Sequence, residues 1–146
     1  MTGGTITGQQ TGQTGLFAVC YQLSRRGWNV LPTSRNARGV DIIAYSQDAS
    51  RMVRLQVKAL RDRNSAVPCD RHMVEGRRPV LVDYWIIVSG LGTNDPEFFI
   101  LTPDEVGQRC FTDRKGEPWL QRNPKDESKG YARPQFREAW ERIGQG

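Results

Sequence analysis

Residues 39–58, GVDIIAYSQDASRMVRLQVK, contain the pattern that decides the fold of this chain. Residues 39–45 and 52–58 are rich in β-branched and apolar side chains, which favours two extended strands. The intervening residues 47–50, QDAS, are of the types that form turns. The stretch therefore predicts a β-hairpin.

The register of this hairpin determines which polar side chains meet. If Ser46 pairs with Arg51 across the turn, the antiparallel ladder places Asp41 opposite Gln56. Alternate residues of a strand share a face, so Gln56 and Lys58 lie about 7 Å apart on one face. Directly opposed residues have Cβ atoms roughly 5 Å apart, so Asp41 joins that face. The sequence thus predicts a cluster of a carboxylate, an amide and an ammonium group, which a slip of one residue would separate.

These three groups suit the hydrolysis of a phosphodiester. A bound divalent metal neutralises charge on the phosphoryl oxygens and activates water. Such hard cations prefer oxygen ligands, and a lysine places positive charge where negative charge grows in the transition state. Simpler interpretations stay open: Asp41 pairs with Arg35 or Arg38, Gln56 serves as a hydrogen-bonding strand residue, and Lys58 is a solvated charge.

Together with a preceding helix and the strand entry at Gly27-Trp28, the motifs Gly39-Val40-Asp41 and Gln56-Val57-Lys58 resemble the PD-(D/E)XK, or restriction-endonuclease-like, nuclease superfamily. The resemblance covers roughly residues 12–101 and extends to Holliday-junction-resolvase-like members. It implies a single-domain α/β restriction-endonuclease-like fold, with a central mixed sheet of about five strands flanked by an N-terminal and a C-terminal helix. It also implies a Mg²⁺- or Mn²⁺-dependent endonuclease that acts on DNA, and a homodimer.

The resemblance assigns roles by position. Asp41 would be the main metal ligand and Gln56 a weaker one. The main-chain carbonyl of Val57 would also face the metal, and Lys58 would be the catalytic lysine.

One position departs from the family pattern. Many relatives carry a glutamate on the first helix, where this chain has Leu16. Gln13, one helical turn earlier, could replace it only as a neutral ligand. Two functions therefore stay open: an endonuclease that holds its metal loosely, and a catalytically inactive nuclease-fold module that binds nucleic acid or a partner protein. A subunit that docks on another chain is a third.

Positive charge is concentrated around these motifs. The net charge is +5, and the segment from residue 35 to residue 78 carries ten Lys and Arg against five Asp and Glu. A basic surplus of this kind is typical of a polyanion partner, although it also suits a solvated basic surface. The predicted nucleic-acid contacts, taken from both sides of the motifs, are Arg35, Arg38, Arg61, Arg63, Arg71, Arg77 and Arg78.

Composition limits the remaining classes. A chain of 146 residues with 37% hydrophobic side chains is expected to form one domain over residues 1–146. It has no apolar run that could span a membrane and no secretory signal pattern at its start. Three cysteines without a CxxC motif and a single histidine, His72, indicate reduced thiols in a cytoplasmic protein and no zinc site.

The rest of the chain gives a coarse pattern of elements. No P-loop, G-x-S-x-G or dinucleotide fingerprint competes with the nuclease motifs. The expected elements are a flexible start at 1–12, a helix at 13–25, strands at 28–32, 82–89 and 97–101, a capped helix from 102, an irregular 112–130, a loop or single helical turn at 60–81, and a last helix at 134–143.

Overall fold

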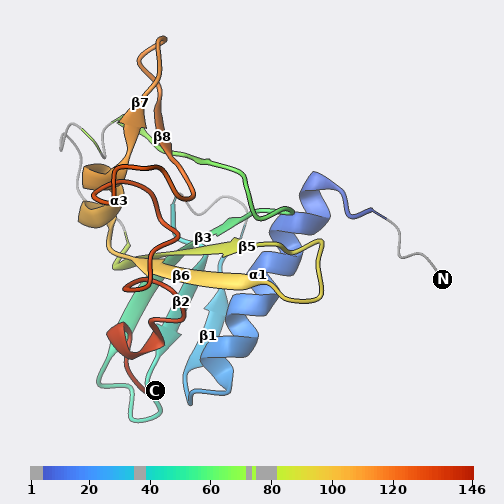
Figure 1. Ribbon diagram of the computed structural model, residues 1–146. Helices are drawn as coiled ribbons and strands as arrows, with labels where there is room; N and C mark the ends of the chain where they lie inside the picture. Colours follow the sequence, from blue (N-terminus) through green and yellow to red (C-terminus); the bar gives the residue numbers. More distant parts are fainter. Residues whose placement is uncertain (1–4, 35–38, 72–73, 75–81) are drawn as a thin grey trace.

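The computed structural model describes residues 5–34, 39–71, 74 and 82–146 (Figure 1). A five-stranded mixed sheet has the order β1-β2-β3-β5-β6, in which β3 and β5 are parallel and the other neighbours antiparallel. The strands of this sheet are β1 (Asn29–Pro32), β2 (Ile42–Tyr45), β3 (Met52–Ala59), β5 (Tyr84–Ser89) and β6 (Glu97–Leu101). Two α-helices accompany it, α1 (Gly8–Ser24) and α3 (Pro103–Arg109). A smaller sheet has the order β4-β8-β7. It consists of β4 (Val67–Pro68), β7 (Phe111–Thr112) and β8 (Pro118–Leu120).

The predicted α/β fold with five strands in a central mixed sheet is confirmed. Two hydrophobic cores lie on opposite faces of that sheet. Leu55, Ile86 and Ile100 belong to the core on the α1 face, whereas Trp85 and Phe99 belong to the core on the other face. The strands β5 and β6 carry side chains of both cores, which explains why their sequences are continuously apolar.

Helix α1 begins earlier than the sequence predicted. Thr7 is the N-cap: its hydroxyl accepts from the Gln10 N–H at 3.1 Å, and the Gln10 side chain accepts from the Thr7 N–H at 2.9 Å. This capping box extends the helix over residues 8–12, which were expected to be flexible. Gly15 lies so close to Ala59 that an added Cβ would be 2.6 Å from the Ala59 Cβ. The helix therefore packs directly on the end of β3.

The C-terminal segment is not the expected helix over 134–143. The Ile100 N–H donates to the Phe136 carbonyl at 3.0 Å, and the Glu138 N–H donates to the Phe98 carbonyl at 2.9 Å. The backbone groups of Phe136 and Glu138, which a helix would have paired internally, therefore form hydrogen bonds with the outer edge of β6. Only a 3₁₀-helix, η1 (Trp140–Arg142), follows. Phe136, Ala139, Trp140 and Ile143, which recur at helical spacing in this segment, are nevertheless buried.

Two other segments are more ordered than predicted. Residues 112–130 were expected to be irregular, yet they contain β8 and complete the β7–β8 hairpin, which projects from the body of the molecule in Figure 1. Within residues 60–81, the structure forms β4, which pairs with β8. Among the described residues, no helix has the length and apolarity needed to cross a bilayer.

The three cysteines are free thiols. Cys69 and Cys110 lie together in the core beneath the smaller sheet, with their sulfur atoms 2.8 Å apart. Cys20 lies on α1 and is partly buried, and burial raises the pKa of its thiol.

Candidate catalytic site

The β2–β3 turn fixes the register on which the site depends. The predicted pairing of Ser46 with Arg51 is confirmed, since the Ser46 N–H donates to the Arg51 carbonyl at 2.9 Å. The Asp48 carboxylate accepts from the Ser46 hydroxyl at 2.8 Å, and from the Ser50 N–H and hydroxyl at 3.0 and 2.7 Å. These bonds, those from Ser50 foremost, lower the pKa of Asp48 to about 2. The turn is therefore closed by an ionised side chain at neutral pH.

Asp41 lies just before β2, where the ladder changes. Its N–H donates to the Leu55 carbonyl at 2.8 Å, although Leu55 is the ladder partner of Ile42. Two consecutive residues therefore face one residue of β3, as in a β-bulge, and Asp41 is not directly opposite Gln56. The Asp41 carbonyl accepts from the Thr33 N–H at 2.9 Å, which ties this bend to the segment after β1.

The bulge brings the Asp41 carboxylate onto the main chain of β3. Its Oδ2 accepts a hydrogen bond from the Val57 N–H at 2.7 Å. The carboxylate occupies the place that a strand carbonyl would take if β2 extended further. Because Val57 stands between Gln56 and Lys58, this bond brings the Asp41 carboxylate to the stretch of β3 that carries the other two predicted catalytic side chains.

Gln56 and Lys58 lie on the face of the sheet opposite α1. They are the ladder partners of Trp85 and Ile87, which both belong to the core on that face. The Lys58 ammonium is 4.9 Å from the centroid of the Trp85 ring, a favourable cation–π distance. Within the described ranges, no ion pair of 4.0 Å or less joins Lys58 to Asp41.

The donor set around Asp41 suits a hard cation with modest affinity. One carboxylate oxygen is used by Val57, which leaves Oδ1 as the ligand atom. The N–H and C=O of a strand residue point toward the same neighbour, so the Val57 carbonyl is directed to the Asp41 side. Gln56 adds an amide oxygen. No cluster of three or more His, Cys, Asp and Glu residues that could hold a metal occurs in the described chain, so the site would depend on fewer such ligands, with Asp41 as the carboxylate that contacts the Gln56-Val57-Lys58 segment.

The fourth predicted ligand, Gln13, does not face this site. The buried line of α1 is formed by Thr11, Gly15, Val19 and Leu23, and Gln13 lies on the exposed side of the helix. A helix turns through 3.6 residues, so a residue two positions from Thr11 points away from the sheet. The structure therefore does not bring Gln13 together with the other predicted ligands.

Leu16, at the position where the sequence resemblance would place an acid, packs its side chain against the core on the α1 face. It contributes no ligand atom. The first helix therefore supplies packing to the described site and no charge.

The predicted nucleic-acid contacts divide into three groups. Arg35, Arg38, Arg77 and Arg78 lie outside the described residues. Arg61 is exposed in the loop that follows β3 and packs along Gly92. Arg63 and Arg71 already have acidic partners: Arg63 lies 3.5 Å from Asp95, and Arg71 lies 2.7 Å from Glu117.

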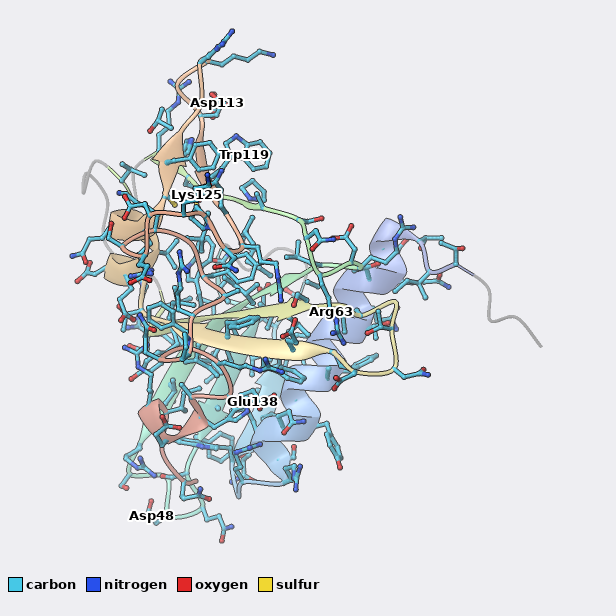
Figure 2. The ribbon with its side chains drawn as sticks, viewed as in Figure 1. Asp48, Arg63, Asp113, Trp119, Lys125 and Glu138 are labelled. Atoms are coloured by element: carbon cyan, nitrogen blue, oxygen red, sulfur yellow. The ribbon has the colours of Figure 1, made fainter. Side chains whose placement is uncertain are left out.

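A charged cluster around Glu97 lies at the end of the sheet where β3 and β5 end, and it was not predicted from the sequence. Glu97 is only 5% exposed, and its carboxylate lies 2.8 Å from the Arg122 guanidinium and 3.3 Å from that of Arg137. The Nε of Arg63 is 4.0 Å away, and Figure 2 shows Arg63 where the β5–β6 loop turns. The signal available in the sequence was a charged residue at the start of the apolar run 97–101.

No family model matches this chain, and no curated protein matches it. Among solved structures it is similar to a bacterial homing endonuclease, I-Ssp6803I, with a TM-score of 0.61 and 18% sequence identity. The match covers 96% of this chain and 93% of that chain. At this identity the likeness shows the fold alone, which is that of a nuclease.

Proposed function

We propose that this protein is a metal-dependent endonuclease that hydrolyses phosphodiester bonds in DNA. The observation that carries the proposal is the Asp41 carboxylate, held 2.7 Å from the Val57 N–H inside Gln56-Val57-Lys58. The likeness to the homing endonuclease fold supports the same class of activity. Membership of the PD-(D/E)XK superfamily is part of this proposal.

The residues divide the work of hydrolysis. Asp41, Gln56 and the Val57 carbonyl would hold Mg²⁺ or Mn²⁺, which when bound supplies charge neutralisation and an activated water. The hydrogen bond from Val57 fixes the Asp41 carboxylate before substrate arrives, so little reorganisation is needed. Lys58, the residue that follows Val57 on the same strand, would add a positive charge toward the scissile phosphate.

The local charge favours a nucleic-acid substrate. Arg61 is exposed in the loop directly after β3, and this loop lies beside the N-terminal half of α1 in Figure 1. Phosphate contacts from such residues position a substrate without specifying its sequence. A dimer would present one such site to each strand of a duplex, and sedimentation analysis with and without DNA would test that arrangement.

The test is nicking of supercoiled plasmid DNA with Mg²⁺ or Mn²⁺. Wild-type protein should convert the plasmid to its open circular form. Asp41→Asn and Lys58→Met should not, and chelation of the metal should stop the wild-type reaction. Asp95→Asn, which changes an exposed acid in the β5–β6 loop, is the matched control and should cleave normally. Wild-type protein that cuts no duplex, branched or single-stranded DNA with either metal would overturn the proposal.

A second candidate function is nucleic-acid binding without turnover. Leu16 favours it, because Leu16 packs against the core and supplies no carboxylate beside Asp41, and the described residues contain no group of three or more potential metal ligands. Binding should then persist without metal and weaken steeply as salt rises. The plasmid assay separates the two functions, since this module would bind DNA and leave it intact.

A further inference from the structure

The β7–β8 hairpin is the element that projects furthest from the body of the protein in Figure 1. Its strands pair as Phe111 with Trp119 and Thr112 with Pro118, and β4 extends them into a small sheet. None of its residues belongs to the candidate catalytic site. The candidate catalytic site therefore does not account for the hairpin tip, residues 113–117.

The tip has a fixed conformation. The Gly116 N–H donates to the Asp113 carbonyl at 3.0 Å, and Gly116 has a φ of +81°, as a turn ending in glycine requires. The Asp113 carboxylate accepts from the N–H groups of Lys115 and Glu117, each at 2.9 Å, and from the Trp119 indole at 3.0 Å. Figure 2 shows Asp113 and Trp119 together near the end of the hairpin. A side chain at this tip is thus presented on a rigid support.

The two acids of the hairpin already have partners. The hydrogen bonds to Asp113, that from the Glu117 N–H foremost, hold the pKa of its carboxyl below the ordinary value. Glu117 forms an ion pair with Arg71 at 2.7 Å, which braces the hairpin against the chain that leaves β4. Both acids are therefore held within the framework of the hairpin, Asp113 by its hydrogen bonds and Glu117 by its ion pair.

The two cations at the tip, by contrast, are exposed. Arg114 and Lys115 occupy the central positions of the turn, and the described ranges contain no side-chain hydrogen bond or ion pair for either of them. Two exposed cations, without an ion-pair partner among the described residues, are therefore held on a rigid, projecting ribbon. That combination selects for a polyanion with regularly spaced charges.

We propose that the β7–β8 hairpin is a second contact for duplex DNA, in which Arg114 and Lys115 bind backbone phosphates. A two-stranded ribbon has the width that the major groove of duplex DNA admits, with phosphates on both rims of the groove. The choice of DNA as the partner rests on the proposed function. The contact itself is independent of cleavage, because it uses no residue of the candidate catalytic site.

The test is the affinity for a duplex of about 30 base pairs, long enough for several helical turns. It is measured by fluorescence anisotropy without divalent metal, so that failure to cleave does not affect it. Replacing both Arg114 and Lys115 with Ala should weaken binding at least about tenfold at about 0.1 M salt. The slope of log K against log salt should fall by about 1.8, which corresponds to two lost phosphate contacts.

Two control variants separate this contact from a general loss of charge. Replacing both Arg25 and Arg51 with Ala removes the same charge from exposed positions, and Arg51 borders the β2–β3 turn at the opposite end of the molecule (Figure 1). This pair should leave the affinity within about twofold of wild type. Exchanging the cations, Arg114→Lys with Lys115→Arg, should preserve binding. Wild-type affinity in the double alanine variant at the hairpin, or an equal loss in the Arg25 and Arg51 variant, would overturn the proposal.

Discussion

The Asp41 carboxylate accepts a hydrogen bond of 2.7 Å from the Val57 N–H, and this side chain continues the hydrogen-bonded ladder just before β2 begins. One carboxylate therefore has two tasks. Its Oδ2 completes the backbone hydrogen bonding of β3, while its charge and its other oxygen are available for a metal. Structural and catalytic effects of changes at Asp41 can be separated because they depend on different properties of the group.

Substitution of Asp41 should separate these two tasks. Asp41→Ala leaves the Val57 N–H without its acceptor and should lower the free energy of unfolding by about 1–3 kcal/mol in urea denaturation. Asp41→Asn retains an acceptor oxygen and should lower it by less than about 1 kcal/mol. Both variants should lose metal-dependent nicking. If Asp41→Asn nicked at the wild-type rate, the charge of Asp41 would be structural only.

Lys58 should matter for the rate of cleavage more than for stability. Lys58→Met keeps a long side chain over the Trp85 ring and removes the charge. Because that charge acts on the transition state, the nicking rate at saturating DNA should fall at least about a hundredfold. Loss of the cation–π contact should change the free energy of unfolding by at most about 1–2 kcal/mol.

The control for this prediction is Lys125→Met, which changes an exposed lysine outside the site and should leave the nicking rate unaltered. A Lys58→Met protein that cleaves at the wild-type rate, with only KM raised, would assign Lys58 to substrate binding.

The hairpin that holds the site was predictable because its determinants are local. Turn residues between two β-branched segments fix the pairing of Ser46 with Arg51, and that pairing determines the faces of Gln56 and Lys58. The bulge at Asp41 was not predictable from the same pattern. It lies outside the two strands of the hairpin, and its Asp41 carbonyl accepts from the Thr33 N–H, which belongs to a separate segment of the chain.

Other differences between prediction and structure have separate causes. The helical spacing of the apolar residues at 136–143 predicted a helix, but this spacing does not reveal that β6 has an open edge with which the segment pairs. The β7–β8 turn has local signals that were not used, with aspartate at its first position and glycine at its last. The Thr7 and Gln10 capping box is another such signal.

The buried Glu97, the first residue of β6, should be important for stability, in contrast to the exposed Asp95 in the preceding loop. Glu97→Ala would leave the guanidinium of Arg122, now 2.8 Å from the carboxylate, without its ionic partner. Removal of one member of a buried pair is expected to lower the free energy of unfolding by about 3–5 kcal/mol. Asp95→Ala removes an 84% exposed carboxylate that also faces an arginine and should change it by no more than about 1 kcal/mol. Urea denaturation at neutral pH compares the two, and equal effects would contradict a buried structural role for Glu97.

The pH dependence of stability should reveal the contribution of the β2–β3 turn. The pKa of Asp48 falls from 3.8 to about 2 through its bonds to Ser50 and Ser46. A group with a lowered pKa stabilises the folded state fully above its unfolded pKa and loses that contribution as the pH falls through its folded pKa. The difference in free energy of unfolding between wild type and Asp48→Asn should therefore be constant above about pH 5 and shrink from about pH 4 toward pH 2.

Urea denaturation over this pH range measures that difference, and Ser50→Ala provides the matched comparison. This variant removes the hydroxyl donor at 2.7 Å and leaves the Ser50 main-chain donor in place. It should raise the pKa of Asp48 toward its ordinary value, so its own stability should depend less on pH between about pH 4 and pH 2. A difference between wild type and Asp48→Asn that stays constant over that range would show that the turn is held by the backbone alone. The register that brings Asp41 to Val57 would then depend on the strands and not on the ionised turn.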